Sequence, residues 1–98
     1  MKLRQRPWEG VDTYLFWCPG CEEAHIFTVR TDGGRPAWSF DGNMQSPTFS
    51  PSLLYPDKKP LCHLFLRDGQ IEFLGDCGHA LAGKTVPLPD LPPEWLDG

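Results

Sequence analysis

Two short apolar runs joined by Asp68-Gly69 constrain the fold of this chain more than any other sequence feature. The runs cover residues 61–67 and 70–74. An Asp-Gly pair between such runs is typical of a two-residue hairpin of type I′. The hairpin fixes which residues of the two strands face each other: Arg67 and Gln70, Leu66 and Ile71, Leu64 and Phe73.

The two faces of this predicted hairpin differ in chemistry, because side chains alternate along each strand. The apolar face is expected to point into a core and carries Cys62, Leu64, Leu66, Ile71, Phe73 and, if the pairing continues, Cys77. On the mostly polar face His63 and Asp76 are diagonal neighbours, with backbones roughly 7 to 8 Å apart. A carboxylate that orients an imidazole is part of a serine–histidine–aspartate arrangement, so this face is a candidate functional surface.

The rest of the chain also favours strands and turns. Residues 11–17 and 25–31 are rich in β-branched and aromatic side chains, and residues 37–40 form a shorter run of this kind. Residues 46–52 contain Pro47 and Pro51, which predicts a rigid extended loop and not a central strand. No segment has the apolar periodicity of a substantial helix. We therefore expect a mostly β fold, a small antiparallel sheet or half-barrel with long loops and a zinc knuckle.

The length and net charge of the chain limit its domain organisation and its possible binding partners. With 98 residues we expect one domain, with a core over residues 11–85 and a proline-rich acidic tail over residues 86–98 that is extended or partly ordered. A net charge of -4 disfavours binding to a nucleic-acid backbone. No apolar run reaches the roughly 18 to 20 residues that span a bilayer, and the start has no hydrophobic leader, so no membrane contact and a cytoplasmic location are expected.

The segment Cys18-Pro19-Gly20-Cys21 has the form of a zinc knuckle, in which two thiolates converge on one ion and Gly20 relieves the turn. Redox use of this motif places it before a helix, and no helix pattern follows. Two more ligands are needed for a closed structural site. The candidates are His25, Cys62, Cys77 and His79. Cys62 is favoured because it lies at a strand end on the apolar face, His25 lies near the knuckle in sequence, and Cys77 is the main rival.

The chain resembles a family of small zinc-binding domains of unknown function from phages and bacteria, some of which are mislabelled as ammonia monooxygenase. The resemblance covers roughly residues 12–90. It rests on Cys18 to Cys21 with His25, Trp38 to Gly42, Pro47 to Ser52, Cys62 to Phe65, Gly69 to Phe73 and Asp76 to Gly83. One branch, in bacterial ubiquitination-like operons, is described as a serine peptidase that removes a ubiquitin-like modifier from its targets.

This resemblance implies a set of roles. Ser52 is the implied nucleophile, His63 or His79 the base, and Asp76 the group that orients the base. It also shifts the fourth metal ligand from Cys77 to His25, which gives a structural Zn²⁺ site of Cys18, Cys21, His25 and Cys62. The implied partner is a protein substrate, a ubiquitin-like protein or its conjugates, in the cytoplasm of a bacterium or an infected host cell.

Two other functions stay open at the level of sequence. One is a binding module without catalysis, in which zinc is structural and Trp38, Trp95 and Pro92-Pro93 engage a partner protein. The other is a metallohydrolase whose zinc is held by His63 and His79 with Asp76 or Cys77. The first predicts no reactive serine, and the second predicts that activity depends on the ion itself.

Overall fold

The protein is nearly all β and consists of two antiparallel sheets, as the expected fold class requires. The computed structural model describes residues 1–5, 12–30, 37–57 and 59–95. A three-stranded sheet has the order β1-β2-β3 and is made of β1 (Arg4–Gln5), β2 (Asp12–Cys18) and β3 (Glu23–Arg30). A five-stranded sheet runs in chain order through β4 (Ser39–Phe40), β5 (Phe49–Tyr55), β6 (Cys62–Arg67), β7 (Gln70–Phe73) and β8 (Thr85–Pro87).

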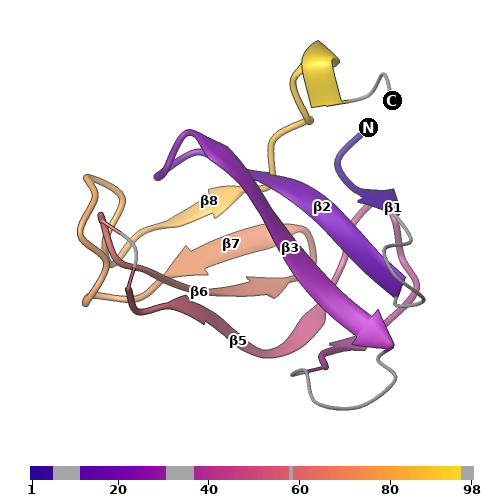
Figure 1. Ribbon diagram of the computed structural model, residues 1–98, viewed down its shortest axis with the longest axis horizontal. Helices are drawn as coiled ribbons and strands as arrows, with labels where there is room; N and C mark the ends of the chain where they lie inside the picture. The colour runs from indigo at the N-terminus through magenta and orange to yellow at the C-terminus, as the bar shows by residue number, and fades with distance from the viewer. Residues whose placement is uncertain (6–11, 31–36, 58, 96–98) are drawn as a thin grey trace.

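The strands β2 and β3 cross over the five-stranded sheet, and the core lies between the two sheets (Figure 1). Stacked aromatic rings connect them. Phe27 of β3 and Phe49 of β5 are both fully buried, with ring centroids 4.1 Å apart and an interplanar angle of 2°. Phe40 stacks on Phe49 at 4.5 Å. Burying such rings supplies much of the hydrophobic stabilisation of a domain this small.

The hairpin predicted at Asp68-Gly69 is confirmed. Both residues have positive φ values, 49° and 71°, as the central positions of a type I′ turn require. The ladder pairs Leu64 with Phe73, Leu66 with Ile71 and Arg67 with Gln70. The apolar face of the hairpin is buried, as expected, at Cys62, Leu64, Leu66, Ile71, Phe73 and Cys77.

The segment around Pro47 and Pro51 differs from the prediction. The prediction of a loop was wrong, because residues 49–55 form β5, which lies between β4 and β6. The register between β5 and β6 shifts between Phe49 and Leu53. Pro51 lies inside this irregularity, where a missing N–H donor does not interrupt a regular ladder.

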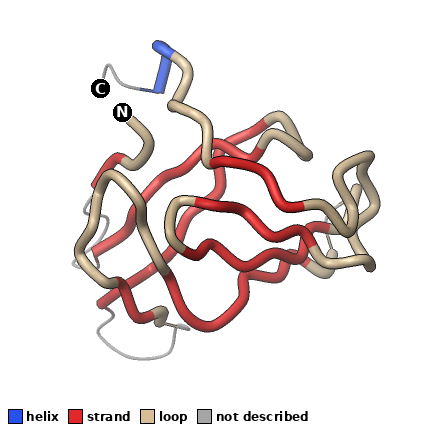
Figure 2. The backbone as a smooth tube through the Cα atoms, turned by 180° about the vertical axis from the view of Figure 1, so that it is seen from behind, coloured by secondary structure: helices blue, strands red, loops and turns tan. Residues whose placement is uncertain are grey.

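The C-terminal segment is more ordered than a free arm. Residues 85–87 form β8, which pairs with β7, and the buried side chains of Leu88 and Leu91 extend the core past residue 85. The backbone N–H of Leu91 donates to the carbonyl of Met1 at 2.8 Å, so the two ends of the described chain lie side by side (Figure 2). Residues 96–98, like Val11 and Thr31 at the ends of the predicted strands, lie outside the described residues.

Helical structure in the described part of the chain is limited to one turn, the 3₁₀ helix η1 (Pro93–Trp95). No described helix is long and apolar enough to cross a membrane.

Candidate active site and metal centre

Three side chains on the outer face of the five-stranded sheet form a hydrogen-bonded series. Nε2 of His63 lies 3.2 Å from Oγ of Ser52, and Nδ1 of His63 lies 3.1 Å from Oδ2 of Asp76. The structure therefore brings together three of the residues that the sequence singled out. The His63 side chain is 23% exposed and that of Asp76 is 56% exposed, so the series is open to solvent.

The strand register explains this meeting. Leu54 of β5 lies directly opposite His63 of β6. Ser52 lies two residues before Leu54, in the irregular stretch of β5, and its Oγ lies within hydrogen-bond distance of Nε2 of His63. Asp76 follows the end of β7 in the turn that passes over His63. Two strands and one turn thus supply one side chain each.

The hydrogen-bond pattern sets the state of the imidazole. An ionised carboxylate only accepts hydrogen bonds, so Nδ1 of His63 carries the proton that faces Asp76. In the neutral imidazole Nε2 is then an acceptor, to which the hydroxyl of Ser52 can donate. This is the tautomer in which an imidazole can remove a proton from a serine.

Trp38 holds the backbone of Ser52. Its indole Nε1–H donates to the carbonyl of Ser52 at 3.1 Å, and its ring packs edge-on against Phe27 with centroids 5.6 Å apart. The alternative of a binding module requires Trp38 to be an exposed aromatic that engages a partner. It is half-buried instead, and both ends of its side chain are engaged.

A second cluster lies on the opposite, inner face of β6. The ligand atoms of Cys18, Cys21, Cys62 and His79 all lie within 4.8 Å of one another. Sγ of Cys62 is 3.9 Å from Sγ of Cys18 and 3.8 Å from Nε2 of His79. In a tetrahedral site with metal–sulfur bonds of about 2.3 Å, two sulfurs are about 3.8 Å apart. The four residues therefore fit a tetrahedral metal ion.

The hydrogen bond between Cys18 and Cys62 shifts the pKa values of these two thiols in opposite directions. A hydrogen bond with Cys62 is the largest influence on Cys18; it outweighs burial and lowers the pKa of Cys18 to about 4. The same hydrogen bond, together with burial, raises the pKa of Cys62. This shift favours the thiolate form of Cys18, which is the form that binds metals.

The fourth residue of this cluster differs from the predicted one. His79 takes the place that was predicted for His25. The ring of His25 is buried between Tyr55, with centroids 4.6 Å apart, and Phe16, at 5.7 Å. His25 lies next to Cys18, but its ring packs among the aromatic side chains and not with the other members of the cluster. Its Nε2 has no hydrogen-bond partner among the described residues.

Gly20 explains how His79 reaches the knuckle. A Cβ atom at Gly20 would lie 2.3 to 2.6 Å from three atoms of the His79 ring, so only glycine leaves room for it. The positive φ of this turn belongs to Glu22, at 56°, and not to Gly20. Glycine is therefore needed at this position because the His79 ring lies close, and not because the backbone is strained. The spacing of the motif in the sequence does not distinguish these two reasons.

Cys77 and His79 occupy different positions from those that the alternatives required. Cys77, the rival ligand, lies outside the group of four and contacts the backbone of His63. His79, the alternative base, faces Cys62. His63 and His79 thus belong to different clusters on the two sides of β6, which is not the shared site that a metallohydrolase would need.

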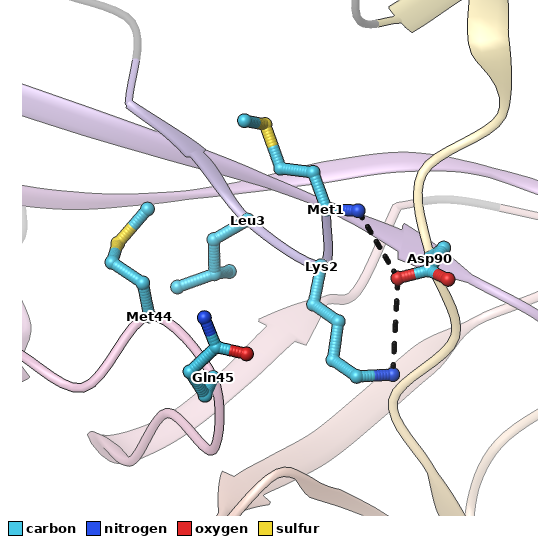
Figure 3. A pocket seen from close by; sticks show the side chains of 6 residues that line it. All are labelled: Met1, Lys2, Leu3, Met44, Gln45 and Asp90. Carbon is cyan, nitrogen blue, oxygen red and sulfur yellow. Dashed lines mark hydrogen bonds and ion pairs between the residues drawn. The ribbon is translucent and has the colours of Figure 1, made fainter.

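One cavity among the described residues lies apart from both clusters (Figure 3). Asp90 accepts a hydrogen bond from the amine of Met1 there and forms an ion pair with Lys2. The cavity is lined by Met1, Lys2, Leu3, Met44, Gln45 and Asp90. None of the residues of the two clusters lines it.

The fold and the two clusters define an all-β protein with a partly buried Cys₃His group on the inner side of β6 and a serine–histidine–aspartate series on the outer face of the five-stranded sheet. Residues 3–74 match the family described as the bacterial ubiquitination-like system serine protease (BubE). The chain belongs to this family, as the resemblance in the sequence predicted. The matched range includes Ser52 and His63 and ends just before Asp76. Comparisons with curated proteins and with solved structures gave no match.

Proposed function

We propose that this protein is a zinc-stabilised serine peptidase of a ubiquitination-like system, which releases a ubiquitin-like modifier from its protein targets. The observation that carries the proposal is the continuous series from Ser52 through His63 to Asp76. Membership of the BubE family supports the reaction class and points to a ubiquitin-like substrate.

In this proposal His63 acts as the base and Asp76 orients it. Oγ of Ser52 attacks the carbonyl carbon of the scissile amide while its proton moves to Nε2 of His63. His63 then gives that proton to the departing amine, which leaves an acyl group on Ser52. Water, deprotonated by His63, hydrolyses this ester and regenerates the serine. Asp76 stabilises the imidazolium that forms in each half of the reaction.

We propose that Zn²⁺ binds to Cys18, Cys21, Cys62 and His79 and has a structural role. Four protein ligands fill a tetrahedral shell, and a closed shell leaves no position for substrate or water. The ion would join the knuckle after β2 to the start of β6 and to the turn after β7.

The test combines a small serine-reactive probe with native mass spectrometry. After incubation with a fluorophosphonate, the expected product is a chain with one bound zinc and one adduct, located at Ser52 by peptide mapping. Ser52→Ala should abolish the adduct. Ser50→Ala is the matched control, because Ser50 is an exposed serine of the same strand and should leave labelling unchanged.

A folded, zinc-loaded protein without an adduct at Ser52 would contradict the peptidase proposal and favour a binding module. Labelling that persists in Ser52→Ala would assign the nucleophile to a different residue. Zinc content is read from the same spectra, so loss of the ion cannot be mistaken for loss of the nucleophile.

A further inference from the structure

The thiol of Cys77 makes two hydrogen bonds to the main chain of one residue. Sγ of Cys77 accepts from the backbone N–H of His63 at 3.3 Å, and the thiol donates to the carbonyl of His63 at 3.1 Å. Cys77 is only 9% exposed. Both hydrogen-bonding capacities of a buried thiol are therefore used on the residue that links Ser52 to Asp76.

The end of β7 explains why His63 needs such a partner. The backbone groups of His63 point toward β7, since its carbonyl also accepts from the N–H of Leu74 at 3.0 Å. β7 ends at Phe73, and the chain then turns away from the ladder. The Cys77 thiol takes the place of the carbonyl that a longer β7 would offer to the N–H of His63.

The turn that carries Cys77 is itself fixed. The N–H of Cys77 donates to the carbonyl of Leu74 at 3.2 Å, and the N–H of Gly78 donates to the carbonyl of Leu61 at 2.9 Å. A Cβ at Gly78 would come within 2.9 Å of Pro60, so this contact depends on glycine. The turn is thus held against the chain just before His63.

We infer that Cys77 is a positioning residue, whose thiol fixes the main chain of His63 so that the imidazole stays within reach of Ser52. This inference rests on the proposed function. Asp76 and Cys77 are consecutive, and they hold the side chain and the backbone of His63 respectively. Cys77 is not one of the four clustered ligands, so its burial is not explained by the metal.

Three substitutions separate hydrogen bonding from packing. Cys77→Ser keeps a donor and an acceptor at this position, whereas Cys77→Ala and Cys77→Val remove both, and valine still fills the space. We expect the rate constant for fluorophosphonate labelling of Ser52 to fall roughly ten- to a hundredfold in the alanine and valine variants, because small displacements of catalytic groups have effects of this size. The serine variant should recover most of that loss.

Labelling is measured well below the melting temperature of each variant, with one zinc per chain confirmed by native mass spectrometry. Under these conditions a general loss of stability does not slow the reaction. Equal labelling rates in the wild type, alanine and valine variants would overturn the inference. So would a serine variant as slow as alanine.

A second readout does not depend on catalysis. The Nδ1 proton of His63, held by Asp76, should give a downfield proton signal in the NMR spectrum of the wild type, identified by its loss in His63→Gln. We expect this signal to broaden or disappear in Cys77→Ala and to remain in Cys77→Ser. If the wild type is not labelled at Ser52, the proposed function fails, and the NMR comparison still decides whether Cys77 positions His63. An unchanged signal in Cys77→Ala would overturn the inference.

Discussion

At the scale of single residues, the absence of a side chain at Gly20 is as important as the thiols beside it. The ring of His79 lies where a Cβ of residue 20 would be. A side chain at residue 20 therefore requires the His79 ring or the knuckle backbone to shift, even though no residue of the cluster is replaced.

We predict that Gly20→Ala weakens metal binding and lowers the melting temperature of the protein. Native mass spectrometry during titration with a chelator should show zinc loss at a lower chelator concentration than in the wild type. Gly75→Ala is the matched control, because a Cβ at Gly75 would have no neighbour within 4 Å and its φ lies outside the left-handed region. Equal zinc retention in both variants would contradict the placement of His79.

Individual residues also show where prediction from sequence ends. The knuckle motif and the hairpin register predict Cys18, Cys21 and Cys62 as members of one cluster, and the structure groups them. The choice between His25 and His79 could not be predicted, because both are at plausible spacings and the decision is made by packing. His25 is buried between two aromatic rings, whereas the path of the turn after β7 brings His79 over Gly20.

At the scale of secondary-structure elements, local signals succeed where the turn residues define the pairing. Asp68-Gly69 set the register of β6 and β7, and that register by itself predicts that His63 lies near Asp76. β5 could not be predicted in the same way. Its two prolines indicate a loop, and only pairing with strands on both sides, around an irregular stretch at residues 49–53, makes it a strand.

Because β5 is irregular near Ser52, we expect its geometry there to depend on Trp38. Trp38→Phe removes the donor to the Ser52 carbonyl and keeps an aromatic ring against Phe27. Loss of this hydrogen bond should lower the free energy of unfolding by about 1 kcal/mol and slow fluorophosphonate labelling of Ser52 several-fold.

Trp95→Phe is the control for this substitution. Trp95 lies in η1, and the side chain of Arg4 donates to its main-chain carbonyl, a hydrogen bond that the substitution preserves. Chemical denaturation and labelling kinetics measured on both variants check the prediction. A Trp38→Phe protein that labels at the wild-type rate would show that Ser52 is held by β5 alone.

At the scale of the whole molecule, the cluster of Cys18, Cys21, Cys62 and His79 brings together residues from both sheets. Cys18 ends β2, Cys62 begins β6, and His79 lies in the turn that also carries Asp76. Structural zinc sites in small domains contribute of the order of 10 kcal/mol to folding. An ion bound here would therefore stabilise both the packing of the two sheets and the position of the turn.

Removal of the metal is predicted to affect the outer face of β6 as well as the inner one. After treatment with a chelator, we expect a lower melting temperature and slower labelling of Ser52, both restored by added Zn²⁺. Differential scanning fluorimetry and labelling kinetics on the same samples make the comparison. Labelling that continues at the full rate in a folded, metal-free protein would show that the serine–histidine–aspartate series is independent of the ion.

Cys62 and His63 are consecutive residues that serve opposite faces of one strand. An insertion or deletion of one residue that slips β6 would turn the thiol outward and the imidazole inward, and both clusters would be lost in a single event. Substitutions, by contrast, can alter either face alone. In genetic terms, an insertion or deletion in β6 affects both sites together, whereas a substitution can affect one site and leave the other intact.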